Sequence, residues 1–296
     1  MKIAIAGSSG LIGTQLVASL RADGHEVLRL VRREATAPME VTWDPAGGSV
    51  DIDKLAGIDA LVNLAGAGVG DHRWSAKYKK TILDSRVDST ALCADIAAQL
   101  RPHVFVSASA IGWYGDTADR KVDESTPAGT GFLADVVRAW EAAAQPARDA
   151  GIRVVHPRTG LVISSKGGAW GKLLPIFKLG LGGKMGSGKQ YWSYISMADE
   201  VAALKFLIAN ESISGPVNLT APQPATNAEI TKVMGRTLRR PTLFAVPAFI
   251  LKTVLGEFSQ EILGSSRVQP SVLVERGYQF IHPTLDTALQ TLTEGA

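Results

Sequence analysis

Short apolar runs alternate with helical patterns through the first half of the chain. Apolar runs long enough for buried strands occur at residues 3–6, 26–31, 60–64, 104–107 and 152–156. Between them, residues 11–22, 75–100 and 132–150 show the apolar spacing of helices, and Gly151 ends the last of these. Strands that alternate with helices are typical of βαβ units. The pattern therefore predicts an α/β fold with a doubly wound parallel sheet.

The amino-acid composition of the chain changes after about residue 166. Residues 167–188 contain eight glycines among large apolar side chains, which is too apolar for a plain linker. Long segments of this kind inside a compact domain are usually functional, so we expect residues 167–192 to line a substrate cleft. The alternative is a short helix packed on the core. Such a helix would use Leu173, Leu174, Ile176 and Phe177.

This change also divides the chain. We expect residues 1–166 to form a nucleotide-binding domain, which later segments near 190–210 rejoin. Residues 167–296 are expected to form a smaller α/β lobe on the substrate side, with a small unit at about 241–292. A helix is predicted over 199–209, and Thr226 with Glu229 fits a capping box that opens another helix.

A glycine-rich turn joins the first strand to its helix. Gly7, Gly10 and Gly13 have the spacing that allows a tight turn and lets the backbone approach a pyrophosphate at the helix N-terminus. The alternative is a glycine-rich turn without a ligand, but the position directly after the first strand favours a dinucleotide site. The residues assigned to the loop are Gly7, Ser8, Ser9, Gly10, Leu11, Ile12 and Gly13.

Two arginines follow the second strand and indicate which dinucleotide is bound. NAD sites commonly place Asp or Glu about 20 residues after the glycines, where it binds the ribose hydroxyls. This chain has Arg32 and Arg33 there, and two guanidinium groups suit the 2′-phosphate of NADP(H). The alternative is a solvated basic turn, and Glu34 follows directly. We predict NADP(H) as the cofactor.

Composition narrows the class of protein. Hydrophobic residues make up 46% of the 296 residues and charged residues 20%, which is an ordinary globular balance. The formal charge of +3 does not indicate a nucleic-acid partner. Cys93 is the single cysteine and can form no internal disulfide, and we find neither a signal peptide nor a membrane span. We therefore expect a cytoplasmic protein with a small-molecule substrate and no membrane partner, and nothing indicates a homo-oligomer.

These residues together resemble the extended short-chain dehydrogenase/reductases, the NAD-dependent epimerase/dehydratase superfamily. Besides the glycines, the similar motifs are 63–66 (Asn-Leu-Ala-Gly), 106–109 before Tyr114, 123–127, 157–160 and 192–195. The chain is most similar to a nucleoside-diphosphate-sugar epimerase-like branch with a short C-terminal domain. The motifs that resemble that branch lie at residues 43–44, 85–86, 140–143, 179–183 and 225–229. The resemblance covers essentially the whole chain and implies a Rossmann-type fold.

The resemblance also implies further cofactor contacts. Around NADP(H), the glycine loop and the two arginines would be joined by Leu64, Ala65, Gly66, Arg86 and Ser107. Arg86 has the alternative of being a surface charge on a helix. The histidines form no cluster with the spacing of metal ligands, so no metal site is expected.

The catalytic residues depart from the superfamily pattern. The usual Tyr-x-x-x-Lys pair uses Tyr as the proton donor and Lys to lower its pKa. At the matching place this chain has Phe132 and Val136, and none of its tyrosines has Lys four residues later. Ser109 matches the family's upstream serine. Tyr114 is the candidate for the missing acid, with a packing role as its equal alternative.

Two functions compete on this evidence. One is an NADP(H)-dependent oxidoreductase or epimerase that acts on a small polar or nucleotide-linked substrate with a non-standard proton donor. The other is a catalytically silent NADPH-binding sensor or partner protein. The loss of Tyr and Lys favours the second, whereas the retained Ser109 and the elaborate glycine and aromatic segment favour the first. We expect an enzyme.

Overall fold

A nine-stranded sheet forms the centre of the protein, for which a computed structural model describes residues 1–293. The strand order is β13-β9-β6-β5-β1-β2-β3-β4, and β7 pairs with β9. All pairings are parallel except that of β3 with β4. The strands are β1 (Lys2–Ala6), β2 (Glu26–Val31), β3 (Glu40–Asp44), β4 (Ser49–Val50), β5 (Ala60–Asn63), β6 (Val104–Ser107), β7 (Ser109–Ala110), β9 (Val154–Thr159) and β13 (Gly215–Leu219).

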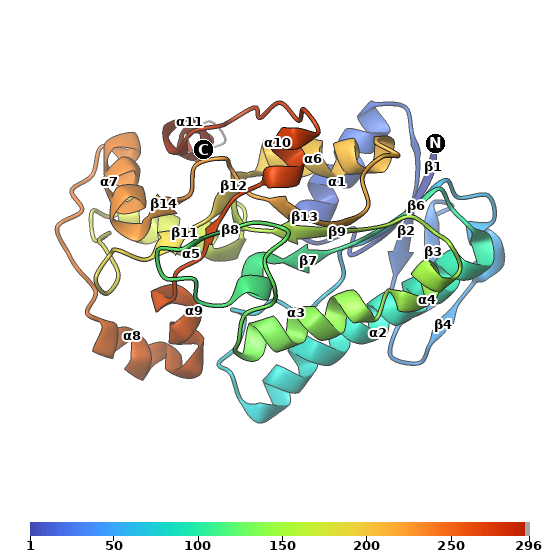
Figure 1. Ribbon diagram of the computed structural model, residues 1–296, viewed down its shortest axis with the longest axis horizontal. Helices are drawn as coiled ribbons and strands as arrows, with labels where there is room; N and C mark the ends of the chain where they lie inside the picture. Colours follow the sequence, from blue (N-terminus) through green and yellow to red (C-terminus); the bar gives the residue numbers. More distant parts are fainter. Residues whose placement is uncertain (294–296) are drawn as a thin grey trace.

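Helices cover both faces of this sheet, so the predicted doubly wound α/β fold is confirmed (Figure 1). Alternate residues of a strand point to opposite faces. Ile3 and Ile5 accordingly join the core under α1 (Leu11–Ala22) and α6 (Met197–Ala209), and Ala4 and Ala6 join the core on the opposite face. That second face is covered by α2 (Ala76–Leu100) and α4 (Gln145–Asp149), and α3 (Phe132–Ala142) packs beside α2.

The predicted helix over 132–150 is wrong in one respect, because it is broken into α3 and α4. Pro146 lies in the first turn of α4 and has no N–H to donate to the carbonyl four residues earlier. The chain therefore turns at Ala143 and Ala144 before it starts a new helix. Strands β3 and β13, in the outer part of the sheet, were not predicted, since polar residues, glycine or proline interrupt the apolar residues in both.

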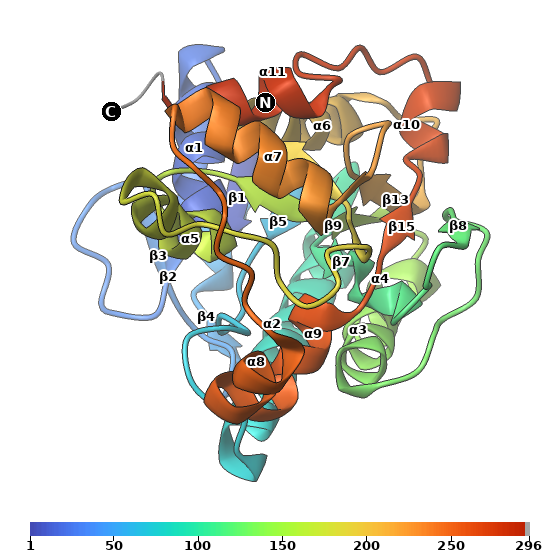
Figure 2. The same ribbon diagram turned by 90° about the vertical axis from the view of Figure 1, so that its left-hand side faces the viewer.

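A second lobe lies beside the carboxyl ends of the strands and contains several helices and short strand pairs (Figures 1 and 2). Its core includes Trp170, Phe177 and Tyr194. The helices are α5 (Gly168–Lys178), α7 (Asn227–Leu238), α8 (Ala248–Leu255), α9 (Ser259–Leu263) and α11 (Leu285–Gln290), whereas α10 (Ser271–Glu275) packs on β13 at the edge of the central sheet. The strand pairs are β10 (Leu161–Ile163) with β12 (Tyr194–Ser196), β11 (Tyr191–Trp192) with β14 (Ala225–Thr226), and β8 (Lys121–Val122) with β15 (Arg267–Val268).

Two predictions for this part of the chain can be compared directly with the helices. Residues 168–178 form α5, which buries Trp170, Leu174 and Phe177, so a helix does pack on the core there. The capping box at Thr226 and Glu229 is present at the start of α7. Three short 3₁₀ helices also lie within residues 1–293: η1 (Ile52–Leu55), η2 (Ile111–Tyr114) and η3 (Gly256–Phe258). No helix within residues 1–293 is long and apolar enough to cross a membrane.

Candidate functional site

The glycine-rich turn brings open backbone N–H groups to the edge of the sheet. Gly7 has a φ of +75°, and its carbonyl accepts a hydrogen bond from the Gly10 amide at 3.0 Å. A Cβ on Gly13 would overlap the carbonyl of Gly7, so the start of α1 packs directly on the turn. Within the described residues no side chain caps α1 at Gly10. The first-turn amides therefore remain available to an anion.

The loop after β5 closes the other side of this turn. A Cβ on Gly7 would collide with Leu64 and Ala65, so the two loops are in close contact. Beneath them, Arg86 donates a hydrogen bond to the Ala67 carbonyl at 2.9 Å and lies 4.9 Å from the Trp140 ring. Burial lowers the pKa of Arg86 to about 10. Arg86 is thus a half-buried support of the 64–67 loop and not a solvated surface charge.

The two arginines after β2 have different surroundings. Arg33 makes two hydrogen bonds to the buried Glu40 carboxylate, at 2.8 and 2.7 Å, and Arg29 contacts the same carboxylate. The hydrogen bonds from Arg33 and Thr36 lower the pKa of Glu40 to about 2. No carboxylate within residues 1–293 pairs with Arg32, which is exposed. Two arginines therefore share one carboxylate, and the neighbouring Arg32 adds a positive charge that fits a bound phosphate.

Ser107 and Ser109 lie at the ends of β6 and β7, in the middle of the same sheet edge. The Ser107 hydroxyl is buried and has no hydrogen-bond partner within residues 1–293. Ser109 Oγ donates a hydrogen bond to Glu141 Oε1 at 2.6 Å. Buried polar groups are nearly always paired, so the free Ser107 hydroxyl leaves one unmet hydrogen bond at this edge.

Glu141 connects Ser109 to a buried arginine. Arg158, on β9, donates to both oxygens of Glu141, from Nε at 2.8 Å and from the terminal nitrogen at 3.0 Å. Its side chain is 2% exposed and lies over the Trp113 ring at 3.9 Å. Such a bidentate pair is the geometry that makes a buried guanidinium tolerable.

Tyr114 continues this network away from Ser109. Its hydroxyl donates to Asn218 Oδ1 at 2.8 Å and accepts from Arg158 at 3.1 Å, and the ring is 2% exposed. Burial raises the pKa of Tyr114 to about 12. Both hydrogen bonds are satisfied inside the protein. The geometry therefore favours the packing alternative for Tyr114 over a direct contact with substrate.

A cavity of about 370 Å³ lies between the start of α3 and the segment around α9. Phe132 forms part of its wall and stacks edge-on against Trp74, whereas Val136 is buried. Glu261 is exposed to solvent at the opposite side of the cavity. The other lining residues are Gly112, Gly115, Thr130, Gly131, Leu133, Ala134, Lys252, Ser259, Gln260, Leu263, Gly264, Ser265 and Ser266.

The glycine and aromatic segment over 167–192 does not line this cavity, and its expected place at a substrate cleft stays a prediction. Instead, a Cβ on Gly167 or Gly168 would lie 3.5 Å from the side chain of Leu11. The beginning of the segment thus lies beside the glycine-rich turn. Later residues reach the far lobe, where Lys184 borders a second hollow.

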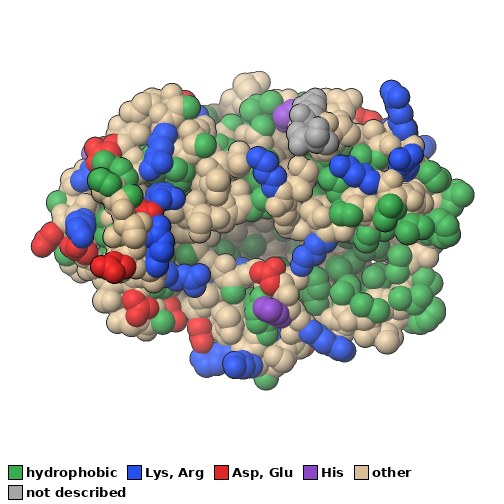
Figure 3. Space-filling view, turned by 180° about the vertical axis from the view of Figure 1, so that it is seen from behind, with side chains coloured by type: hydrophobic (Ala, Val, Ile, Leu, Met, Phe, Trp, Pro, Cys, Tyr) green, Lys and Arg blue, Asp and Glu red, His purple; other side chains and the backbone are tan. Residues whose placement is uncertain are grey.

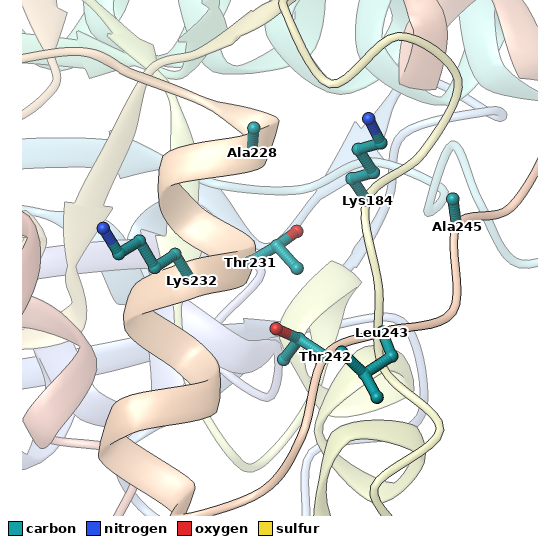
Figure 4. A pocket seen from close by; sticks show the side chains of 7 residues that line it. All are labelled: Lys184, Ala228, Thr231, Lys232, Thr242, Leu243 and Ala245. Atoms are coloured by element: carbon teal, nitrogen blue, oxygen red, sulfur yellow. The ribbon is translucent and has the colours of Figure 1, made fainter.

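This second hollow, of about 180 Å³, lies between α7 and residues 242–245. Figure 4 shows the side chains of Lys184 and Lys232 pointing away from each other, with Thr231 and Thr242 between them. The two ammonium groups therefore do not converge on one ligand. Among residues 1–293 no group of three His, Cys, Asp or Glu side chains could hold a metal ion.

Comparison with known families agrees with this architecture. The model of the NAD dependent epimerase/dehydratase family matches residues 3–219. The chain belongs to this family. A second model, a domain of unknown function called DUF1731, matches residues 246–292, which cover α8 to α11. The resemblance recognised in the sequence is thus confirmed.

Relatives extend the similarity over the full chain. The epimerase family protein ML0860 of Mycobacterium leprae is 46% identical over 292 residues, covering 98% of this chain and 95% of that protein. The chloroplastic homologue of SDR39U1 in Arabidopsis thaliana is 35% identical, covering 99% of this chain and 87% of that protein. Human SDR39U1 (isoform 2), whose crystal structure contains NADPH, matches with a TM-score of 0.92 at 32% identity, and all of both chains is covered.

Three residues of the site were given no role in the sequence analysis: Glu40, Glu141 and Arg158, although the last two lie in the motifs 140–143 and 157–160. One sequence signal was available. Arg158 lies two residues beyond the predicted strand 152–156 and falls within β9, and a buried charge in a strand of the sheet requires a partner. The identity of that partner, on a helix 17 residues earlier, could not be read from the sequence.

Proposed function

We propose that the protein binds NADPH and acts as an oxidoreductase or epimerase on a small polar or nucleotide-linked substrate. The observation that carries this proposal is the uncapped start of α1 behind the glycine-rich turn, with a surplus of positive charge at the end of β2. The NADPH in human SDR39U1 supports the same cofactor here.

In this proposal, the first-turn amides of α1 hold the pyrophosphate, and Arg32 and Arg33 hold the 2′-phosphate. Ser107 offers the free hydroxyl at the sheet edge. Glu40 is a positioning residue, because its carboxylate fixes the guanidinium of Arg33 at a defined place. The Arg32 side chain has no carboxylate partner within residues 1–293, so we expect Arg32 to contribute more than Arg33 to binding of the 2′-phosphate.

Binding measurements test the cofactor assignment. Arg32→Ala should weaken NADPH at least about tenfold, since a charged hydrogen bond to phosphate is lost, and should leave NADH within about twofold. Arg33→Ala should act in the same direction but more weakly, because Glu40 already occupies two of its donors. Lys54→Ala, on the exposed 3₁₀ helix η1, is the control. Equal affinity of the parent protein for NADPH and NADH would contradict the assignment.

Ser109 and Tyr114 are the catalytic candidates from the sequence, and we propose Ser109 as the residue that meets the substrate oxygen. When bound, NADP(H) would exchange a hydride with the substrate carbon, since NADP⁺ takes it from an alcohol and NADPH gives it to a carbonyl. Ser109 directs its own proton at Glu141, so its lone pairs remain able to accept a hydrogen bond from a substrate hydroxyl. In the oxidising direction the alcohol proton would pass to Ser109 Oγ as the Ser109 proton passes to Glu141, and in the reducing direction both transfers would reverse, so that Ser109 protonates the carbonyl oxygen.

The second candidate function is a silent NADPH-binding protein. It is favoured by Phe132, which offers no proton where the family has its acid, and by the buried hydrogen bonds of Tyr114. An assay distinguishes the two functions: NADPH oxidation is measured by absorbance in the presence of each member of a panel of carbonyl compounds and nucleotide sugars. An enzyme should oxidise NADPH with at least one compound and lose this activity in Ser109→Ala. Tight NADPH binding without any turnover would favour the sensor.

A further inference from the structure

An unusually large share of exposed apolar side chains lies on one part of the second lobe. Twelve large hydrophobic side chains are exposed within residues 1–293, and eight of them fall in residues 176–181 and 243–254. Leu243 is 85% exposed and Leu179 is 74% exposed. We call this set the basic apolar face: Ile176, Leu179, Leu181, Leu243, Phe244, Phe249, Ile250 and Val254.

The two segments form one continuous surface. Arg240 Nε donates to the Lys178 carbonyl at 2.8 Å, and the Val246 amide donates to the Lys184 carbonyl at 2.8 Å. The next helix, α8, has no buried residue among its eight. Figure 3 shows hydrophobic side chains gathered on this side of the molecule, with Lys and Arg around them. Contiguous exposed apolar surface marks an interaction site.

Positive charge is concentrated in the longer stretches of chain that include these two segments, although Arg236 in one of them pairs with Asp286. Residues 166–198 and 230–256 together contain ten Lys and Arg and no Asp or Glu. The remaining chain therefore holds 21 basic and 28 acidic residues, although the whole protein has a net charge of only +3. Lys178, Lys184 and Lys252 belong to these segments, and Lys252 lies on α8 itself. The partner of this face should therefore be both apolar and negatively charged.

We propose that the basic apolar face docks on an anionic phospholipid surface. Exposed Leu and Phe side chains would enter the boundary between head groups and acyl chains, and the lysines and arginines would attract the acidic head groups. A symmetric contact between two copies is disfavoured, because it would bring two such basic faces together. Since Lys252 also lines the cavity beside α9, docking would place that cavity near the lipid.

Vesicle co-sedimentation of the full chain tests this proposal. The protein should sediment with vesicles of equimolar phosphatidylglycerol and phosphatidylcholine, should not sediment with phosphatidylcholine alone, and should be released by high salt. The double variant Leu243→Ser with Phe249→Ser should reduce binding at least about tenfold, because two inserted apolar side chains are lost. Both side chains are exposed, so the variant should fold. Val274→Ser, which changes an exposed apolar residue on α10, is the matched control and should bind as the parent does.

Three results would overturn the proposal. The first is no sedimentation with the acidic vesicles, and the second is equal binding to neutral vesicles. The third is a dimer in light scattering that the double variant at Leu243 and Phe249 abolishes, since the face would then join two copies of the chain. The charge contribution is checked with Lys178→Glu combined with Lys184→Glu, which should lower binding to acidic vesicles and leave NADPH affinity unchanged.

Discussion

Neutralising Glu141 isolates the energetic role of the buried network next to Ser109. In Glu141→Gln the side-chain volume is kept and the negative charge is removed. Arg158 then remains 2% exposed without a countercharge, and its hydrogen-bond acceptors are reduced to the amide oxygen of the new side chain and the Tyr114 hydroxyl. Removing one partner of a buried ion pair costs about 3–5 kcal/mol, because the other charge stays buried without compensation.

Urea unfolding followed by circular dichroism measures this loss directly. We expect the unfolding free energy to fall by about 3–5 kcal/mol and the melting temperature by roughly 6–10 °C, at about 2 °C per kcal/mol for a chain of this size. The double variant Glu141→Leu with Arg158→Met should recover at least half of that loss, since no buried charge is left unpaired. Asp135→Asn is the control on the same helix, because its ion pair with Arg138 is more than half exposed and should contribute about 0.5 kcal/mol or less.

The reasoning would be refuted if Glu141→Gln unfolded within about 1 kcal/mol of the parent protein. The loss of the negative charge beside the buried Arg158 would then cost little, contrary to the argument from an unpaired charge. A double variant that is less stable than the single one would also contradict it, because packing and not the unpaired charge would then dominate.

Restoring the family's usual pair, with Phe132→Tyr and Val136→Lys, should not create carbonyl reductase activity. The double variant should also have a lower melting temperature, because Val136 is 2% exposed and a lysine there would be buried without a partner. Burial raises the pKa of Glu200 to about 8, above its value of about 4.3 in an unfolded chain. The unfolding free energy should therefore fall as the pH rises from about 5 to 8. In urea titrations, Glu200→Gln should make the unfolding free energy depend less on pH over this range. Burial lowers the pKa of His156 to about 4, below its unfolded value of about 6.5, so stability should also fall as the pH drops from about 6.5 to 4. His156→Gln should reduce this loss of stability at acid pH. If the loss is the same in the variant, groups other than His156 cause it.

The residues of the cofactor turn could be assigned from the sequence because their information is local. Gly7, Gly10 and Gly13 follow a strand and open a helix, and a positive φ with close backbone contact is a property of that short segment alone. The arginines after β2 were found in the same way, by their fixed distance from the glycines. The alternation of strands and helices likewise predicted the doubly wound sheet, since each period is encoded in neighbouring residues.

Pairings between distant segments were decided only by the tertiary structure. The hydrogen bond from Ser109 to Glu141 joins residues 32 positions apart, and that from Tyr114 to Asn218 joins residues 104 positions apart. Neither partner has a local signature, so the sequence left Tyr114 equally assigned to catalysis and to packing.

The basic apolar face, like these pairings, was decided only by the tertiary structure. Residues 166–198 and 230–256 each carry an excess of positive charge that can be counted in the sequence, but neither reveals that the two segments share one surface. Nor does the sequence show that Leu179 and Leu243 remain exposed, because an apolar residue is equally suited to a core. Periodicity and turn chemistry thus determined the elements and the cofactor loop, whereas burial and partner choice arose only when the chain folded.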